Sequence, residues 1–222
     1  MSWGGGEANA IIQNRLNYFK KIGLAIARAV FADQVHGTEI RRIEAADAGR
    51  GKFEAEDRIP ATDGLLMHIP GLILTTLHAD CAPIFYADPE HKAIGLAHAG
   101  WRGILAGMPG KMLATMENEF GSKRREIQVV VGPMIGTSSY EVAPDLAERF
   151  VQRFGPQVAT ESGGKPHLDL FAAIVANLLE NNLEPNKIPA RPACTACDQV
   201  YASFRRDGAP PRSMLAWLEI KA

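Results

Sequence analysis

Three side chains of this sequence have the chemistry to hold a metal ion together. They are His36 in the segment QVHG, Cys81 in HADCAP and His98 in AHAGWRG. A thiolate and two imidazoles suit zinc, and they also suit copper of the blue type. Three protein ligands would leave a fourth position open for water or a substrate, as in catalytic zinc sites. Because the residues lie far apart in the chain, simple packing in the core is the alternative.

The segment after His98 favours a ligand-binding role. Gly100 and Gly103 flank Trp101 and Arg102 directly after a predicted strand. Glycines let the backbone come close to a ligand, and the indole of Trp101 would be free to stack on one. We therefore expect Trp101 to bind substrate.

Short strands mixed with helices must position these residues. The strand predicted over 92–98 is the most informative, because a period of two places Ile94, Leu96 and His98 on one face. A turn is predicted at His36 and Gly37, and a loop over 46–60. The other predicted strands span 32–43 (in part), 72–77, 83–87, 127–131, 201–204 and 214–220. The predicted helices span 10–30 with a break at Gly23, 101–120 with a fresh start at Pro109, 144–154 and 170–179.

This mixture predicts one α/β domain with a mixed sheet over residues 1–222. Strands and helices follow each other without a regular strand–helix–strand repeat, and no internal repeat or low-complexity linker divides the chain. A chain of 222 residues with 46% hydrophobic and 22% charged residues can bury one sizeable core.

Charge and cysteine content limit the possible partners. A net charge of −1 provides no field that would attract nucleic acid. The longest apolar run, over 65–77, is too short and too interrupted to span a bilayer. We see no signal peptide, and an odd number of cysteines, 3, favours free thiols in a reducing compartment. We therefore expect a cytoplasmic protein that acts on small molecules, without a membrane or nucleic-acid partner.

Five segments taken together resemble a known family. They read TDGLL, ADCAP, HAGWRG, VGPMIGTSSYEV and SFRRDG, and the resemblance extends from about Asn14 to the C-terminus. They are similar to the YfiH-type family, which is also called the laccase-domain or polyphenol oxidase family. Its members are described as purine nucleoside phosphorylases with adenosine deaminase and methylthioadenosine phosphorylase activity.

The resemblance implies a fold and a ligand set. The fold would be a single layered α/β domain like the catalytic domain of cytotoxic necrotizing factor. The metal ligands would be His36, Cys81 and His98, the same residues that the side-chain chemistry indicates, with zinc or copper as the cofactor.

One segment departs from the family pattern. The family begins with a strand that carries a TRxGGxS motif, and its arginine is thought to help hold phosphate. Here the chain opens with MSWGGGEANA, no arginine precedes Arg15, and the glycines at 4–6 are a candidate remnant. We therefore expect a shortened or divergent N-terminal strand, and phosphorolysis is the activity that this departure affects most.

Carboxylates near the ligands are candidates for proton transfer. Deamination of adenosine at a zinc site needs a carboxylate that carries protons to the leaving amine. Asp80, next to Cys81, is the catalytic candidate, and the alternative is a hydrogen bond that holds a ligand histidine. Asp63 could fill either role, although an Asp-Gly turn is the simpler interpretation. His78 is most simply a core or surface residue, with an additional proton shuttle as the alternative.

Phosphorolysis also needs an anion site. Arg102 and Arg206 are the candidates to clamp phosphate, and Arg205 and Arg212 are weaker ones. Each of these arginines could instead form a structural salt bridge.

The segment CTAC holds the remaining cysteines, Cys194 and Cys197. A lone pair of this spacing can be redox-active or can form half of a zinc site. Because the chain has no second pair, we interpret Cys197 as incidental.

Four functions compete at this point. The favoured one is a zinc-dependent purine nucleoside phosphorylase and adenosine deaminase with its site at His36, Cys81 and His98. A copper-dependent polyphenol oxidase is the second, although a multicopper centre consumes more histidines than the 6 present. The third is a metal-binding domain without strong activity, and the fourth is a cysteine hydrolase with a Cys81–His98 dyad. The sequence does not indicate the oligomeric state.

Overall fold

The computed structural model describes residues 8–209 and 212–221. The glycines at 4–6, compared above with the family's first strand, lie outside the described residues. The helices are α1 (Ala8–Lys21), α2 (Trp101–Leu105), α3 (Met108–Phe120), α4 (Pro144–Phe154), α5 (Leu170–Glu180) and α6 (Phe204–Asp207). The strands are β1 (Ala29–Phe31), β2 (Ile40–Arg42), β3 (Gly64–Met67), β4 (Ile73–His78), β5 (Ala82–Asp88), β6 (Ala93–Ala99), β7 (Gln128–Val131), β8 (Ala159–Ser162), β9 (Lys165–Leu168) and β10 (Met214–Glu219).

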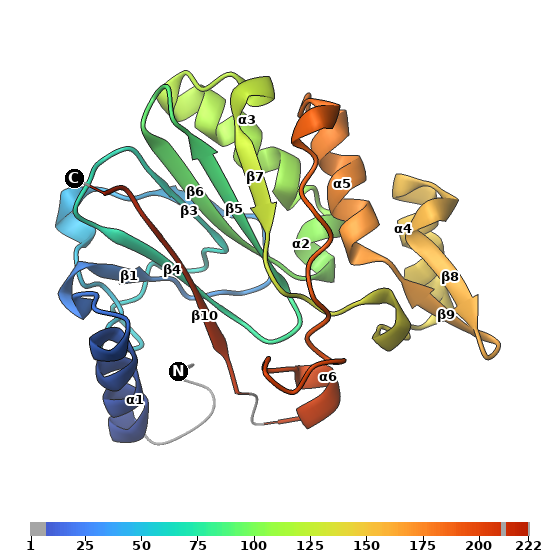
Figure 1. Cartoon of the computed structure of the whole chain (residues 1–222), viewed down its shortest axis with the longest axis horizontal. Coiled ribbons are helices and arrows are strands. Elements are labelled where there is room, and N and C mark those ends of the chain that lie inside the picture. Colours follow the sequence, from blue (N-terminus) through green and yellow to red (C-terminus); the bar gives the residue numbers. More distant parts are fainter. Residues whose placement is uncertain (1–7, 210–211, 222) are drawn as a thin grey trace.

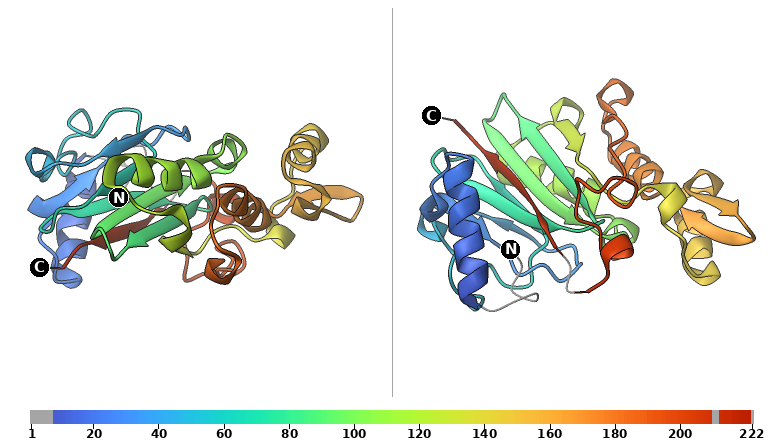
Figure 2. Two further views of the ribbon diagram at one scale, coloured as in Figure 1. Left: turned by 90° about the horizontal axis from the view of Figure 1, so that it is seen from above. Right: turned by 60° about the horizontal axis from the view of Figure 1, so that its bottom comes forward.

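Two mixed sheets form the centre of the molecule (Figure 1). The larger sheet has the order β2-β3-β6-β5-β7, in which only β2 and β3 are parallel. The smaller sheet has the order β1-β4-β10, with β1 parallel and β10 antiparallel to β4. Strands β8 and β9 form a separate hairpin, which projects from one end beside α4 (Figure 2). The prediction of a mixed α/β domain is confirmed.

The molecule has four layers, because alternate side chains of the strands point to opposite faces of each sheet. Leu74 of β4 and Leu96 of β6 belong to one apolar cluster, which lies between the two sheets. Ile73, the neighbour of Leu74, faces the other way and packs with Phe19 of α1. On the far side of the larger sheet, α3 lies so close to β6 that a Cβ on Gly95 would stand 2.9 Å from the Met112 sulfur. The order is therefore helix, small sheet, large sheet, helices.

Most predicted elements agree with the structure. The strands predicted over 72–77, 83–87, 92–98, 127–131 and 214–220 correspond to β4, β5, β6, β7 and β10 within one residue at each end. The fresh helix start near Pro109 is also present, since α3 begins at Met108 after Gly107 in the left-handed conformation. The methionine stripe of α3 is core, because Met108, Met112 and Met116 are fully buried.

Two predicted elements were wrong. The helix predicted over 10–30 ends at Lys21, because Gly23 adopts a φ of +72° and Ala29–Phe31 then pairs with β4. The strand predicted over 201–204 is absent, because Ser203 caps α6 by accepting a hydrogen bond from the Arg206 amide. The sequence analysis also missed β3 and the hairpin β8–β9.

Candidate metal centre

His36, Cys81 and His98 come together at one end of the larger sheet. Their potential ligand atoms all lie within 4.8 Å of one another. Cys81 directly precedes β5 and His98 lies near the end of β6, and these antiparallel strands pair Pro83 with His98. His36 comes from the segment between β1 and β2, and its ring centroid is 4.8 Å from that of His98. The structure thus brings together the three residues proposed from the sequence.

One buried carboxylate organises both histidines. Asp63 Oδ1 accepts hydrogen bonds from His98 Nδ1 at 2.8 Å and from the His36 amide at 3.0 Å. Asp63 Oδ2 accepts from the amides of Gly37 at 2.7 Å and Val35 at 3.1 Å. These bonds hold His36 at a φ of +61°, a conformation that a non-glycine residue adopts only when its surroundings impose it.

The Asp63 contact also selects the ligand atom of His98. A histidine whose Nδ1–H donates to a carboxylate has its other nitrogen, Nε2, free to bind a metal. The simpler interpretation of Asp63, an Asp-Gly turn, therefore misses its main contact, since Asp63 is fully buried and paired with His98.

Gly100 makes room for the cluster. A Cβ at this position would lie 2.9 Å from Cys81 Sγ and 3.0 Å from His36 Cδ2. Such distances are shorter than van der Waals contacts, so any larger residue would displace two of the three candidate ligands. The first glycine of HAGWRG is therefore required for the packing of this cluster.

The protein groups around the cluster favour an anionic thiolate beside a cationic imidazole. Burial raises the pKa of the Cys81 thiol, but hydrogen bonds from His36 and His98 outweigh this effect and lower it to about 6. Burial lowers the pKa of His98, but its hydrogen bonds with Asp63 and Cys81 outweigh this effect and raise it to about 9. A thiolate with two imidazoles, partly open to a cavity, is a donor set that fits zinc or copper.

The cluster opens on a cavity of about 590 Å³. Trp101, Arg102, Tyr140, Phe204 and Arg205 line this cavity together with the cluster. The guanidinium of Arg102 lies 4.2 Å above the ring of Trp101. Trp101 therefore supports Arg102 with one face, in addition to lining the cavity.

Arg205, the weaker candidate, lines the cavity, whereas Arg206 does not. Arg206 donates to the carbonyl oxygens of Thr195, Asp198 and Tyr201, and its Nε and Nη2 atoms pair with the two carboxylate oxygens of Asp207. Through these bonds Arg206 holds α6 against the loop that precedes it, so its role is structural. Arg212 also pairs with Asp207 and is not among the residues lining the cavity.

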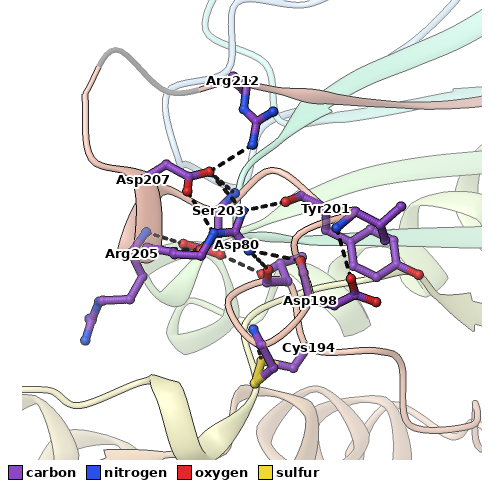
Figure 3. A network of polar contacts seen from close by, with 12 residues as sticks. Asp80, Cys194, Asp198, Tyr201, Ser203, Arg205, Asp207 and Arg212 are labelled. Carbon is purple, nitrogen blue, oxygen red and sulfur yellow. Dashed lines mark hydrogen bonds and ion pairs between the residues drawn. A yellow bond between two sulfur atoms is a disulfide. The ribbon is translucent and has the colours of Figure 1, made fainter.

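Asp80 lies beside the cluster, but its carboxylate forms hydrogen bonds with the segment over residues 195–205. Its Oδ1 accepts from the Thr195 hydroxyl at 2.6 Å, and its Oδ2 accepts from the Arg205 amide at 2.7 Å (Figure 3). Asp80 has a φ of +82° and its carbonyl accepts from the Ile135 amide at 2.9 Å. Asp63, and not Asp80, is the carboxylate partner of His98, a candidate ligand.

His78 is buried next to the cluster. Its Nδ1 lies 3.1 Å from the Cys81 carbonyl oxygen and its Nε2 lies 2.7 Å from the Thr76 hydroxyl. Burial lowers its pKa well below the usual value, and the nearby charge of His98 adds to this effect. A neutral His78 thus fixes the carbonyl of Cys81, which the sequence alone did not indicate.

The cysteines of CTAC do not follow the prediction of free thiols. Cys194 and Cys197 form a disulfide, and Cys81 is the free cysteine of the described residues. Cys197 is therefore a specific partner of Cys194, and its interpretation as incidental was wrong. The spacing of two residues was the available signal, because it places two cysteines within reach of each other.

Comparisons with known proteins identify the family of this chain. A family model described as multi-copper polyphenol oxidoreductase laccase matches residues 3–219. The purine nucleoside phosphorylase YlmD of Geobacillus stearothermophilus is 30% identical over 96% of this chain and 80% of the relative. A purine nucleoside phosphorylase of Mycobacterium tuberculosis is 32% identical over 97% of this chain and 82% of the relative.

Solved structures show the same fold. The crystal structure of YlmD from Geobacillus stearothermophilus superposes with a TM-score of 0.93, covering 100% of this chain and 84% of the other at 28% identity. The structure of the hypothetical protein YfiH from Bacillus licheniformis gives a TM-score of 0.91 at 27% identity, covering 99% of this chain and 86% of the other. The chain therefore belongs to the multi-copper polyphenol oxidoreductase laccase family, the YfiH-type family that its five sequence segments resemble.

Proposed function

We propose that this protein is a zinc-dependent purine nucleoside phosphorylase that also deaminates adenosine and cleaves methylthioadenosine. The observation that carries the proposal is a His–Cys–His cluster that faces the same cavity as Arg102 and Arg205. The names of its relatives as purine nucleoside phosphorylases support it. We also propose that the whole chain acts as one domain in the cytoplasm. In the described residues, no helix is long and apolar enough to cross a membrane.

The cavity residues would divide the work of substrate binding. Zinc held by His36, Cys81 and His98 would supply Lewis-acid activation in its open position. Arg102 and Arg205 would contact phosphate, because guanidinium groups match the geometry of phosphate oxygens. The aromatic side chains beside them, Tyr140 and Phe204, offer flat surfaces on which a purine can stack.

Asp80 would act in this scheme as a positioning residue. One oxygen of its carboxylate accepts from the Arg205 amide, and the other accepts from the Thr195 hydroxyl. Through these two hydrogen bonds it would fix the arginine that contacts phosphate. Arg206 would contribute in the same indirect way, by holding the loop that carries Arg205.

Copper oxidation of phenols is the second candidate, and the donor set is the observation that favours it. The same thiolate and imidazoles suit a single copper ion. Within the described residues, they are the one group of three or more potential ligands found close together, so this part of the chain offers a mononuclear site. A mononuclear site does not provide the several copper ions that a laccase uses.

The test is product analysis of the zinc-loaded protein with adenosine, inosine and methylthioadenosine, with and without phosphate. Free base that forms only with phosphate supports the phosphorylase, and inosine formed from adenosine supports the deaminase. Cys81→Ala should abolish both reactions, whereas His68→Gln, an exposed position after the end of β3 that is opposite Asp63, should retain them. Full activity of Cys81→Ala would overturn the proposal, and phenol oxidation with bound copper would favour the second candidate.

A further inference from the structure

The disulfide of Cys194 and Cys197 lies at the edge of the site, in the loop that precedes α6 (Figure 3). The loop packs on the segment after β7, where a Cβ on Gly136 would meet Cys194 Cβ at 3.0 Å. Thr195, enclosed by the two cysteines, bonds to the Met134 carbonyl through its amide and to Asp80 through its hydroxyl. The disulfide thus encloses the residue that contacts Asp80.

The two sulfur atoms differ in their surroundings. Cys197 is exposed and Cys194 is half-buried. The Cys197 amide donates to Cys194 Sγ at 3.2 Å, while the Ser139 hydroxyl lies 3.3 Å from Cys197 Sγ and 3.8 Å from Cys194 Sγ. The amide bond would stabilise a thiolate on Cys194, so Cys194 is suited to leave when a thiol attacks the exposed sulfur of Cys197.

A purely structural role explains the disulfide poorly. Disulfides stabilise proteins mainly by closing long loops, and this one encloses only Thr195 and Ala196. The loop already has other ties, because Thr195 bonds to Met134 and its carbonyl accepts from Arg206. The main effect of the ring is therefore local, since it restricts the backbone of Thr195 and thereby the direction of its hydroxyl.

The Thr195 hydroxyl is connected to the metal cluster through one residue. It donates to Asp80 Oδ1 at 2.6 Å, and Asp80 precedes the ligand Cys81 in the chain. The other oxygen of Asp80 holds the Arg205 amide, and Arg205 lines the cavity. Asp80 also stands in a left-handed conformation that its neighbours must maintain. The ring therefore encloses a residue whose hydroxyl contacts the cavity wall through Asp80.

We propose that Cys194 and Cys197 form a reversible thiol–disulfide site whose redox state controls the order of the Asp80–Arg205 wall of the cavity. A thiolate of a low-molecular-weight thiol or a protein dithiol attacks Cys197, and Cys194 leaves as a thiolate. A second reductant thiolate then attacks the reductant sulfur of the mixed disulfide and releases Cys197. Two electrons pass to the protein sulfurs, which take up two protons at neutral pH, and the reductant becomes a disulfide. The proposal does not use the nucleoside activity and is tested separately from it.

The first measurement is a redox titration of the native, zinc-loaded protein in glutathione buffers. Differential alkylation and mass spectrometry report each cysteine. Cys194 and Cys197 should change together from protected to alkylated within the range of the buffers, while Cys81 keeps one reactivity throughout. A Cys194–Cys197 disulfide that resists fully reduced glutathione in the folded protein would overturn the proposal.

The second measurement is hydrogen exchange of the amides that Asp80 holds. Exchange at Ile135 and Arg205 should increase several-fold on reduction, while amides of α5 stay unchanged. Thr195→Val keeps the disulfide but removes the hydroxyl, so it should show the faster exchange in both redox states. Cys197→Ser should also exchange fast in both states. Equal exchange in oxidised and reduced wild-type protein would overturn the link to Asp80.

Discussion

Replacing Asp63 by asparagine tests how the centre is held together. The carboxylate accepts four hydrogen bonds, from His98 Nδ1 and from the amides of Val35, His36 and Gly37. An asparagine has only one oxygen, so its NH₂ group must face either the His36 and His98 donors or the other two amides. If the NH₂ group faces His98, it donates to Nδ1 and moves the proton of the ring to Nε2, the atom needed for the metal.

These contacts predict a loss of both metal affinity and stability in Asp63→Asn. Removing a hydrogen-bond partner of a metal-binding histidine lowers metal affinity by about 10- to 100-fold. Leaving buried N–H groups unsatisfied also costs about 1–3 kcal/mol of stability. We therefore expect Asp63→Asn to fold with a lower Tm and to bind zinc about 10- to 100-fold more weakly than the wild type.

Zinc affinity can be measured by competition with a chromophoric chelator, on protein whose fold is checked by near-ultraviolet circular dichroism. Asp169→Asn is a matched control, because Asp169 caps α5 through the Ala172 amide and pairs with Arg191 away from the cluster. Asparagine caps a helix about as well as aspartate, so this control should lose at most about 1 kcal/mol, from the ion pair with Arg191, and no zinc affinity. A folded Asp63→Asn protein with the zinc affinity of the wild type would refute the role of Asp63.

Three further predictions concern the same cavity. Gly100→Ala should remove zinc from the folded protein, since its Cβ would stand 2.9 Å from Cys81 Sγ; retention of zinc on elemental analysis would contradict this. With the pKa of His98 raised to about 9 and that of Cys81 lowered to about 6, zinc binding near pH 7.5 should release about one proton, from His98, because Cys81 is already ionised. Below about pH 6 Cys81 must also lose a proton, so affinity should fall more steeply, as calorimetry in buffers of different ionisation enthalpy can measure. Arg205→Gln should raise the KM for phosphate several-fold and lower the Tm only slightly, because it removes the bonds of Arg205 to the Ser139 and Glu141 carbonyls. Arg206→Gln should lower the Tm more than it changes this KM, because it removes bonds to three carbonyls and the ion pair with Asp207.

The sequence predicted the sheets better than the connections between them. A period of two indicates which face of a strand is buried, and this is why His98 was correctly placed with Ile94 and Leu96. Periodicity does not show which residue ends a helix when an apolar stripe continues beyond it, as after Gly23. It also cannot separate a strand from a loop whose apolar residues pack against a neighbour, as at 201–204. Both errors depend on tertiary contacts that a local pattern does not contain.

The candidate ligands could be predicted from the sequence because few residue types bind zinc. The residues that hold these ligands in place could not be predicted in the same way. Cysteine and histidine are the residue types that zinc prefers, so few alternatives existed. Aspartate has many structural uses, and the sequence offered Asp80 and Asp63 with no means to choose between them. The choice depends on which carboxylate the fold turns toward His98. The same holds for Arg205 and Arg206, neighbours whose side chains leave α6 in different directions.

Unusual backbone conformations explain why these carboxylates and loops are needed around the cluster. His36 and Asp80 both adopt positive φ values without being glycine. His36 is itself a candidate ligand, and Asp80 directly precedes the candidate ligand Cys81. Such conformations persist only when several hydrogen bonds impose them. The amide of His36 is held by Asp63, and the carboxylate and carbonyl of Asp80 are held by Thr195, Arg205 and Ile135. Asp63 is fully enclosed in the core, while one of the bonds to Asp80, from the Thr195 hydroxyl, comes from a loop with an exposed sulfur. A change at the surface can therefore reach Asp80 more readily than it can reach Asp63.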